Sequence, residues 1–459
     1  MFRAFLSFLL FGLATGSVHA LPELRVAANN RHLETAEGKP FFLLGDTAWE
    51  LFHRLTREET LAYLDARQKQ GFNTVLAVAL AEFEFDKPNA YGEMPLENND
   101  PAKPRDAYFQ HVDWVIAEAA KRGIYTGLLP TWGDKWNKKW GKGPEIFTPE
   151  NAVAYGEWLG RRYKDQPVIW ILGGDRAVES DLHREIIRAM AAGLEKGDGG
   201  KHLISYHPQG ERNSSDFWPD EKWLDFHMFQ SGHGRAAFPN HTLNAKNLAL
   251  PALKPTMDGE PNYEDHPVRG LMKDGKPTIW FNDHDVRRAA WWSVLSGACG
   301  HIYGTHSIWQ FHDPGKRQQL TDARTPWRQA LDLPGAADMG IMKGFCEKAE
   351  WWKLRRNDEF LKKPHGGWKP EEMPMAAVAE DGSSAVIYLP VIPAGVVVPD
   401  WSKLKFTAKE AELYVLAPYS GGSHVLLTVP AEGIPASLIQ GDTTKPADAV
   451  LWIRRKSGL

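Results

Sequence analysis

The chain has 459 residues, of which 43% are hydrophobic and 24% are charged, and its net charge at pH 7 is −4. This composition is typical of a globular protein, and the length is sufficient for one large domain and a smaller one. Acidic and basic residues are interspersed, and the absence of a basic stripe argues against a nucleic-acid partner. The 19 Trp residues can fill cores, but indole rings also stack on sugars, which favours a carbohydrate partner.

Residues 1–20 have the pattern of an export signal. Arg3 provides a positive start, residues 5–13 form a short apolar run, and residues 18–20 suit a cleavage site. The run is too short to span a bilayer comfortably, and no other stretch reaches the about 18 apolar residues of a membrane helix. We therefore predict a periplasmic or secreted protein without stable membrane insertion. A retained anchor is the alternative.

After a short β-hairpin at 24–40, apolar runs alternate with amphipathic helices. The helix that starts at 56 opens with a capping box formed by Thr56 and Glu59. Eight strands that alternate with helices predict a (β/α)8 barrel over residues 21–360. An open doubly wound sheet is the alternative, although no Gly-x-Gly-x-x-Gly opens a helix. We expect strands at 41–49, 73–80, 124–132, 168–173, 203–208, 223–230, 254–260 and 301–306, and helices at 56–67, 108–121, 148–163, 180–194 and 285–296.

A helix near Gly335 links the barrel to residues 361–459, which follow a different pattern. Asp381-Gly382 forms a hairpin turn, and short β runs are separated by Pro and Gly. This pattern predicts a small antiparallel β-sandwich as a second domain. The β runs are at 375–379, 385–389, 412–416, 424–429 and 449–453.

The chain contains two cysteines, Cys299 and Cys346. Export would permit a disulfide between them, whereas their apolar neighbours suit two buried free thiols equally well. No Cys-x-x-Cys pattern suggests a zinc site.

Polar and aromatic residues stand at the ends of most predicted barrel strands. The carboxyl ends of barrel strands hold the active site in this fold, so these side chains would line one concave site. Isolated helix caps are the alternative, but so many polar strand ends in one chain favour a site. The candidates for substrate binding are Asp46, Trp49, Glu82, Trp132, Arg176, His207, His227, Gln230, Tyr263, His306 and Trp309.

Two carboxylates matter most, Asp175 after the fourth strand and Glu260 after the seventh. These strands lie across the bore from each other, so the two side chains can converge. One carboxyl would then be protonated and donate to a leaving oxygen, while the other would be ionised and attack an anomeric carbon. Alternatively, Asp175 caps the helix that begins near 180, and Glu260 is a solvated turn acid.

Four histidines, His207, His227, His233 and His306, raise a rival interpretation, a metal-dependent hydrolase on the same barrel. Enzymes of that class usually carry two His one residue apart after the first strand. This chain has Gly-Asp-Thr at 45–47 instead, and no His-x-His occurs anywhere. We therefore expect no metal and no other cofactor.

Several segments together resemble the apiosidase-like glycoside hydrolases, glycoside hydrolase family 140. The resemblance covers residues 24–360 and, more weakly, the tail. The segments are Gly-Lys-Pro-Phe-Phe-Leu-Leu-Gly-Asp-Thr-Ala-Trp-Glu-Leu-Phe at 38–52, Gly-Phe-Asn-Thr-Val at 71–75, Val-Ile-Trp-Ile-Leu-Gly-Gly-Asp at 168–175, Asp-Gly-Glu-Pro-Asn-Tyr-Glu at 258–264, Arg-Arg-Ala-Ala-Trp-Trp-Ser-Val-Leu-Ser-Gly-Ala at 287–298 and Gly-His-Ile-Tyr-Gly at 300–304.

The resemblance implies a retaining clan A barrel with Asp175 as acid/base and Glu260 as nucleophile. Many clan A enzymes have Asn-Glu at the end of the fourth strand, whereas this chain has Gly-Asp at 174–175. The family's activity removes apiose-linked side chains from the pectin rhamnogalacturonan-II. Residues 413–422 are a degenerate form of the family's tail motif, so we expect no ligand role there. The alternatives are another clan A pentosidase, such as an arabinofuranosidase, and a non-catalytic sugar-binding barrel.

Overall fold

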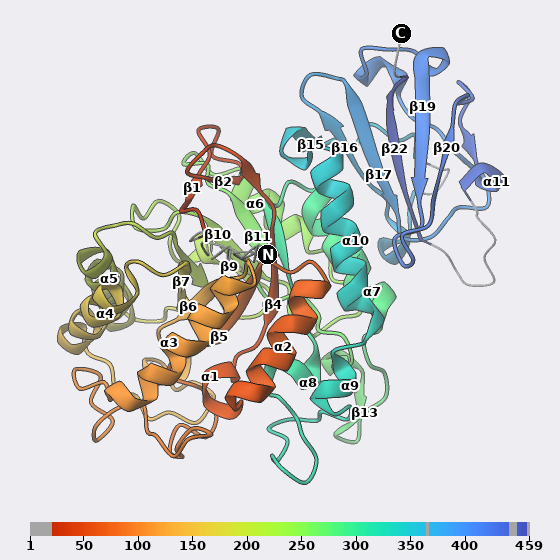
Figure 1. The fold of residues 1–459 in the computed structure, drawn as a ribbon. Coiled ribbons are helices and arrows are strands. Elements are labelled where there is room, and N and C mark those ends of the chain that lie inside the picture. Colours follow the sequence, from red (N-terminus) through yellow and green to blue (C-terminus); the bar gives the residue numbers. More distant parts are fainter. Residues whose placement is uncertain (1–20, 364–366, 440–447, 457–459) are drawn as a thin grey trace, which may run out of the picture.

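The computed structural model describes residues 21–363, 367–439 and 448–456, arranged as a barrel and an antiparallel sheet (Figure 1). The expected export signal at 1–20 lies outside the described residues. Within them, no helix has the length and apolar character needed to cross a membrane.

Eight parallel strands form the barrel, in the hydrogen-bonded order β8-β7-β6-β5-β4-β14-β11-β10. The ring closes between β8 and β10, where the Asp225 N–H donates to the Ile204 carbonyl at 2.8 Å. The predicted (β/α)8 fold is therefore confirmed. The strands are β4 (Leu43–Thr47), β5 (Thr74–Val78), β6 (Tyr125–Leu129), β7 (Val168–Gly173), β8 (Ile204–His207), β10 (His227–Gln230), β11 (Thr256–Asp258) and β14 (Gly300–Tyr303).

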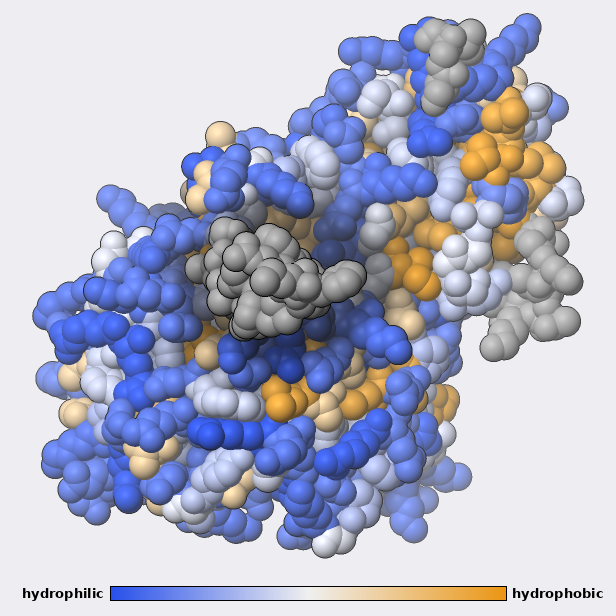
Figure 2. Space-filling model, viewed as in Figure 1, coloured by the Kyte–Doolittle hydropathy of each residue, from blue (hydrophilic) through white to orange (hydrophobic). Residues whose placement is uncertain are grey.

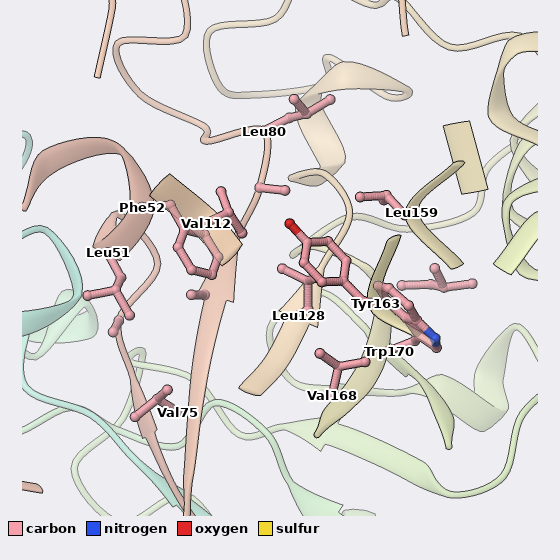
Figure 3. Packing of buried hydrophobic residues seen from close by; sticks show 14 of the residues in the cluster. Leu51, Phe52, Val75, Leu80, Val112, Leu128, Leu159, Tyr163, Val168 and Trp170 are labelled. Carbon is pink, nitrogen blue, oxygen red and sulfur yellow. The ribbon is translucent and has the colours of Figure 1, made fainter. Parts of the chain in front are cut away.

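Successive residues of each strand face alternately the bore and the helices, as strand geometry requires. In β7, Ile169 and Ile171 face the bore, whereas Val168 and Trp170 pack outwards. Figure 3 shows Val168 and Trp170 in this outer core, close to Tyr163 of α4. The main outer helices are α2 (Arg57–Lys69), α3 (Asp106–Lys121), α4 (Pro149–Tyr163), α5 (Asp181–Asp198), α6 (His241–Leu248) and α7 (Asp283–Leu295).

Capping residues determine where several helices begin. The predicted capping box of Thr56 and Glu59 is present at the start of α2. At α5, the Ser180 hydroxyl accepts a hydrogen bond from the His183 N–H, so Ser180 is the cap. Asp175 therefore does not cap this helix, and its carboxylate is available for another role.

Several short elements were not predicted, because each is too short to show a hydrophobic period. They include a hairpin of β12 and β13 in the loop after β11, and the strand β9, which pairs with β10. The unpredicted elements of the barrel part include α1 (Leu51–Arg54), α6, α8 (His306–Trp309), α9 (Trp327–Ala330), β9 (Arg212–Asn213), β12 (Met272–Lys273) and β13 (Lys276–Pro277).

Both cysteines, Cys299 and Cys346, are buried and free.

The amino-terminal hairpin is a three-stranded sheet of β1 (Leu24–Val26), β2 (Leu33–Thr35) and β3 (Pro40–Phe41). Its apolar residues pack with the residues of the bore. The Tyr125 hydroxyl, at the start of β6, donates to the Pro22 carbonyl at 2.5 Å. The sheet therefore closes the amino-terminal end of the bore, opposite the carboxyl ends of the strands.

The second part is the predicted antiparallel β-domain, and it contains a six-stranded sheet. One face packs on α7 and α10 (Pro334–Lys348), and the other is covered by loops and by β18 (Val396–Val397) paired with β21 (Ile434–Pro435). Figure 2 shows apolar surface over this part, whereas the barrel surface is largely hydrophilic. In order, the strands are β15 (Leu354–Arg356), β16 (Met375–Ala379), β17 (Ser384–Leu389), β22 (Ala449–Arg455), β19 (Ala411–Leu416) and β20 (Ser423–Leu426).

A buried arginine joins the two parts. Arg287 of α7 donates to both oxygens of Asp448, at 2.7 and 3.0 Å, and to Asp338 of α10 at 2.6 Å. Nearby, the ring of Trp291 stacks on Tyr388 with centroids 5.7 Å apart. The sheet begins with β15 at 354, earlier than the expected boundary after 360, because β15 pairs with β16.

Candidate active site

A turn of three residues with positive φ, Gly173, Gly174 and Asp175, places the Asp175 side chain at the carboxyl end of β7. Gly173 and Gly174 have φ of 93° and 94°, and Asp175 follows with φ of 55°. A Cβ on Gly173 would lie 2.4 Å from the His207 carbonyl oxygen, and one on Gly174 would lie 2.7 Å from the Gly133 nitrogen. Only glycine fits this turn. Left-handed non-glycine residues cost stability and are concentrated at functional sites.

Glu260 stands beyond β11 and is 6% exposed. The preceding Gly259 lets the chain pass close to β10, because a Cβ there would lie 2.2 Å from the Met228 methyl group. One carboxylate oxygen, Oε1, is 3.0 Å from His233 Nε2, and the other, Oε2, is 3.1 Å from His207 Nε2. Two imidazoles therefore flank the carboxylate.

His207 connects the two carboxylate-bearing residues. Its Nδ1 accepts the backbone N–H of Asp175 at 3.3 Å. A neutral imidazole that accepts at Nδ1 carries its proton on Nε2, the nitrogen that faces Glu260. The ring thereby holds the backbone of Asp175 while it presents an N–H to Glu260.

The two carboxyls have opposite pKa shifts. Burial, together with the charge of Glu260, raises the pKa of Asp175 above the usual carboxyl range. Burial also opposes ionisation of Glu260, but the close imidazoles of His207 and His233 outweigh it and lower the pKa of Glu260. The site therefore favours a protonated Asp175 beside an ionised Glu260.

Arg176 is fully buried behind Asp175 and connects it to the neighbouring strands. Its guanidinium lies 3.1 Å from Glu82 Oε1, after β5. Burial raises the pKa of Glu82 to about 7, although the charge of Arg176 opposes the rise. Besides Glu82, Arg176 donates to the carbonyl oxygens of Asn137, Asp175 and Trp140, at 3.2, 2.8 and 2.6 Å.

Aromatic side chains form the floor of the site. Trp49 lies 5.0 Å from Trp132 and 5.4 Å from His207 between ring centroids. The Trp49 indole N–H donates to the Tyr263 hydroxyl at 3.2 Å. Such a floor offers flat apolar surface with hydrogen-bonding edges, which suits the C–H faces and hydroxyls of a sugar.

Three further predicted residues lie at the same end of the barrel. Trp309 donates to His306 Nδ1 at 3.3 Å, and His306 contacts His266, which stacks on His233 with centroids 4.2 Å apart. Gln230 is buried, and its Oε1 has no hydrogen-bond partner among the described residues. This oxygen is a free acceptor for a ligand hydroxyl.

The structure does not bring Asp46 and His227 to this group. Both point away from the bore, because they occupy the outward positions of their strands. The Asp46 carboxylate is fully buried and accepts from Tyr63 at 2.6 Å and Arg67 at 2.7 Å. His227 Nδ1 is paired with the Ser214 hydroxyl at 2.9 Å. The prediction that they contact substrate is corrected to a structural role.

Two residues beside the carboxylates were not among the predicted substrate-binding residues. The sequence suggests His233 only as a metal ligand, although its position between two glycines after the sixth strand is typical of a functional loop. Trp140 donates through Nε1 to Asp175 Oδ2 at 3.2 Å. It precedes Gly-Lys-Gly at 141–143, which marks a tight loop, but sequence alone does not show where this loop folds back. In the described ranges, no three His, Cys, Asp or Glu side chains converge as a metal site would require.

Comparisons with known proteins agree with the barrel fold. The Apiosidase-like catalytic domain family matches residues 27–353. A crystal structure of a glycoside hydrolase family 5 protein from Bacteroides vulgatus is 29% identical, with a TM-score of 0.82 over 95% of this chain and 94% of that one. Another structure, described as a glycoside hydrolase, is 28% identical, with a TM-score of 0.80 over 95% of this chain and 98% of that one.

A curated relative matches a smaller part of the chain. Mannan endo-1,4-beta-mannosidase 3 of Oryza sativa subsp. japonica is 27% identical over 165 residues, which are 28% of this chain and 35% of that protein. The match therefore spans about a third of the relative's length.

Proposed function

The chain belongs to the apiosidase-like glycoside hydrolases, and we propose on this basis that it removes apiose-linked side chains from rhamnogalacturonan-II with retention of configuration. It is a glycoside hydrolase of clan A type with a saccharide substrate. The observation that carries the proposed mechanism is that His207 lies between Asp175 and Glu260, whose pKa values are shifted in opposite directions.

In the first step, Glu260 attacks the anomeric carbon while the bond from that carbon to the leaving oxygen breaks. Asp175 gives its proton to this oxygen, so the leaving group departs as an alcohol. The glycosyl group is then held as an ester of Glu260. In the second step, Asp175, now ionised, takes a proton from water, which attacks the anomeric carbon and releases Glu260 as a carboxylate.

The surroundings of the carboxylates support a small sugar as the glycosyl group. Aspartate is one methylene shorter than the glutamate common at this position, so Asp175 reaches less far into the site. The floor of Trp49 and Trp132 offers an apolar face, and Glu82 and Gln230 offer acceptors for hydroxyls. These features suit a furanose of apiose size.

The test is to incubate the protein with rhamnogalacturonan-II fragments and to identify the released monosaccharide. Glu260→Gln and Asp175→Asn should each lose about 10²-fold or more in rate while the circular dichroism spectrum stays that of the wild type. Release of arabinose would instead indicate an arabinofuranosidase, and binding without release would indicate a non-catalytic barrel. Full activity of Glu260→Gln would refute the assigned nucleophile.

Retention of the anomeric configuration is tested by a separate measurement. Proton NMR of the first-formed sugar should show the anomer of the substrate, because two successive displacements restore the configuration. In a crystal structure, the two carboxyl groups should be about 5–5.5 Å apart, whereas a gap of about 6.5–9.5 Å would indicate inversion.

We also propose that the protein is exported, on the pattern of residues 1–20. Amino-terminal sequencing of the mature protein from the periplasm or medium should begin at Leu21. A mature chain that begins at Met1 would contradict cleavage.

A further inference from the structure

Trp140 lies beside the proton donor on a loop of the barrel. The loop follows β6 and carries the indole to Asp175, where its Nε1 donates to Oδ2 at 3.2 Å. Trp140 is 39% exposed, more than any other tryptophan among the described residues. An exposed indole at the rim of a sugar-binding site, hydrogen-bonded to the acid, is placed to act on the leaving group.

Both side-chain donors of Asp175 reach the same oxygen. Trp140 Nε1 is 3.2 Å from Oδ2, and Nη1 of Arg176 is 3.4 Å from it. When the carboxyl is neutral, one oxygen carries the proton and the other accepts. Since Oδ2 already faces two donors, the proton is held on Oδ1. The acid is therefore oriented before substrate binds.

The loop is held in place by a buried carboxylate. Asp134, which is fully buried, accepts the backbone N–H groups of Lys142 and Gly143 at 3.1 and 2.6 Å. The Trp140 carbonyl accepts from Arg176 at 2.6 Å. The loop is therefore anchored on both sides of position 141, which fixes the direction of the indole.

Arg176 also determines which face of the indole is open. Its guanidinium carbon lies 4.5 Å from the centroid of the ring, and Arg176 itself is fully buried. The face under Arg176 is thus the inner one. Lys139 Nζ lies 6.0 Å from the same centroid, and the exposed part of Trp140 is directed to solvent. An apolar ring face that borders a general acid can receive the C–H face of a sugar.

We propose that Trp140 is a positioning residue that holds Asp175 with its proton on Oδ1 and receives the leaving-group sugar on its open face. This inference rests on the proposed function. It couples leaving-group binding to proton donation, because the same side chain contacts the acid and the departing sugar. The glycosidic oxygen of a sugar stacked on Trp140 would then face Oδ1.

The test compares wild type, Trp140→Phe and Trp140→Ala on an apiosyl disaccharide and on 4-nitrophenyl apiofuranoside, whose leaving group needs little protonation. Trp140→Phe keeps an aromatic face and loses the N–H. Its kcat on the disaccharide should fall about tenfold, with KM nearly unchanged, and its rate on the aryl substrate should change little. Trp140→Ala should also raise KM for the disaccharide.

The pH profile separates positioning from a structural effect. The indole N–H lowers the pKa of Asp175, so its loss should move the alkaline limb of the Trp140→Phe profile to higher pH. Trp158→Phe is the matched control, because its indole also lies under an arginine, Arg162 at 5.1 Å, but on outer helix α4. It should leave kcat, KM and both limbs unchanged.

The outcomes distinguish the two proposals. An active wild type with an unchanged alkaline limb in Trp140→Phe would overturn the role of Trp140 alone. Equal losses of Trp140→Phe on both substrates would also overturn it, since an effect on proton donation must depend on the leaving group. A wild type that cleaves neither apioside would overturn the proposed substrate, and this inference with it.

Discussion

Nε2 of His207 lies 3.1 Å from Oε2 of Glu260, and both side chains are almost completely enclosed. The opposite nitrogen of the same imidazole accepts the backbone N–H of Asp175. One ring therefore contacts the carboxylate of the proposed nucleophile and the main chain of the proposed acid. A change at this position should affect both groups.

We expect His207→Ala to lower kcat by about 10²-fold and to move the acidic limb of the pH profile to higher pH. The close imidazoles of His207 and His233 lower the pKa of Glu260, and loss of one of them lets that pKa rise. The measurement is kcat/KM against pH. His183→Ala, on outer helix α5, is the control. An unmoved acidic limb would mean that His207 does not set the ionisation of Glu260.

The wild-type profile should be bell-shaped. Activity needs Glu260 ionised, so the acidic limb should lie below the usual carboxyl pKa, and it needs Asp175 protonated, so the alkaline limb should lie above it. With an aryl substrate of low leaving-group pKa, Asp175→Ala should keep the acidic limb and lose the alkaline one. Persistence of the alkaline limb would assign it to another group, such as Glu82.

Asp46→Ala should affect stability rather than binding. Removal of this fully buried carboxylate leaves the fully buried Arg67 without its partner, which costs about 3–5 kcal/mol of unfolding free energy. Urea denaturation measures the loss, and KM of the folded protein should stay unchanged. A raised KM at normal stability would restore the original prediction that Asp46 contacts substrate.

Gly141→Ala should lower kcat while the free energy of unfolding changes little. Gly141 has φ of 94°, and an added Cβ would lie 2.5 Å from Nη2 of Arg176 and 2.8 Å from Glu82 Oε1. The methyl group should displace the Trp140 loop from Asp175. Gly123→Ala is the matched control, since Gly123 has φ of 74° and nothing within 4 Å of its added Cβ. Comparable kinetics for the two variants would show that only backbone strain matters.

Sequence patterns predicted the barrel because each of its strands and long helices has its own period or cap. Thr56 with Glu59 and the buried run before Asp175 are local signals, and the structure retains both. Short elements such as α8 and the β12–β13 hairpin have no such signal.

The residues of the site were predicted less completely than the fold, because the direction of each side chain depends on the exact residue at which its strand ends. Asp46 is still inside β4, where alternation turns it outwards, whereas Glu260 lies beyond β11 and turns into the bore. Trp140 depends on how Asp134 folds its loop, which is a long-range contact that no local pattern encodes.

The carboxy-terminal sheet has a consequence for how this enzyme could be shortened or recombined. Its strands cover α7 and α10 with aromatic side chains, and Asp448 neutralises a guanidinium that would otherwise be buried without that partner. The family match ends at residue 353, but a barrel that ended there would expose the apolar surface that the sheet covers. A swap between relatives should therefore exchange the barrel and its sheet together, because the two have a shared interior.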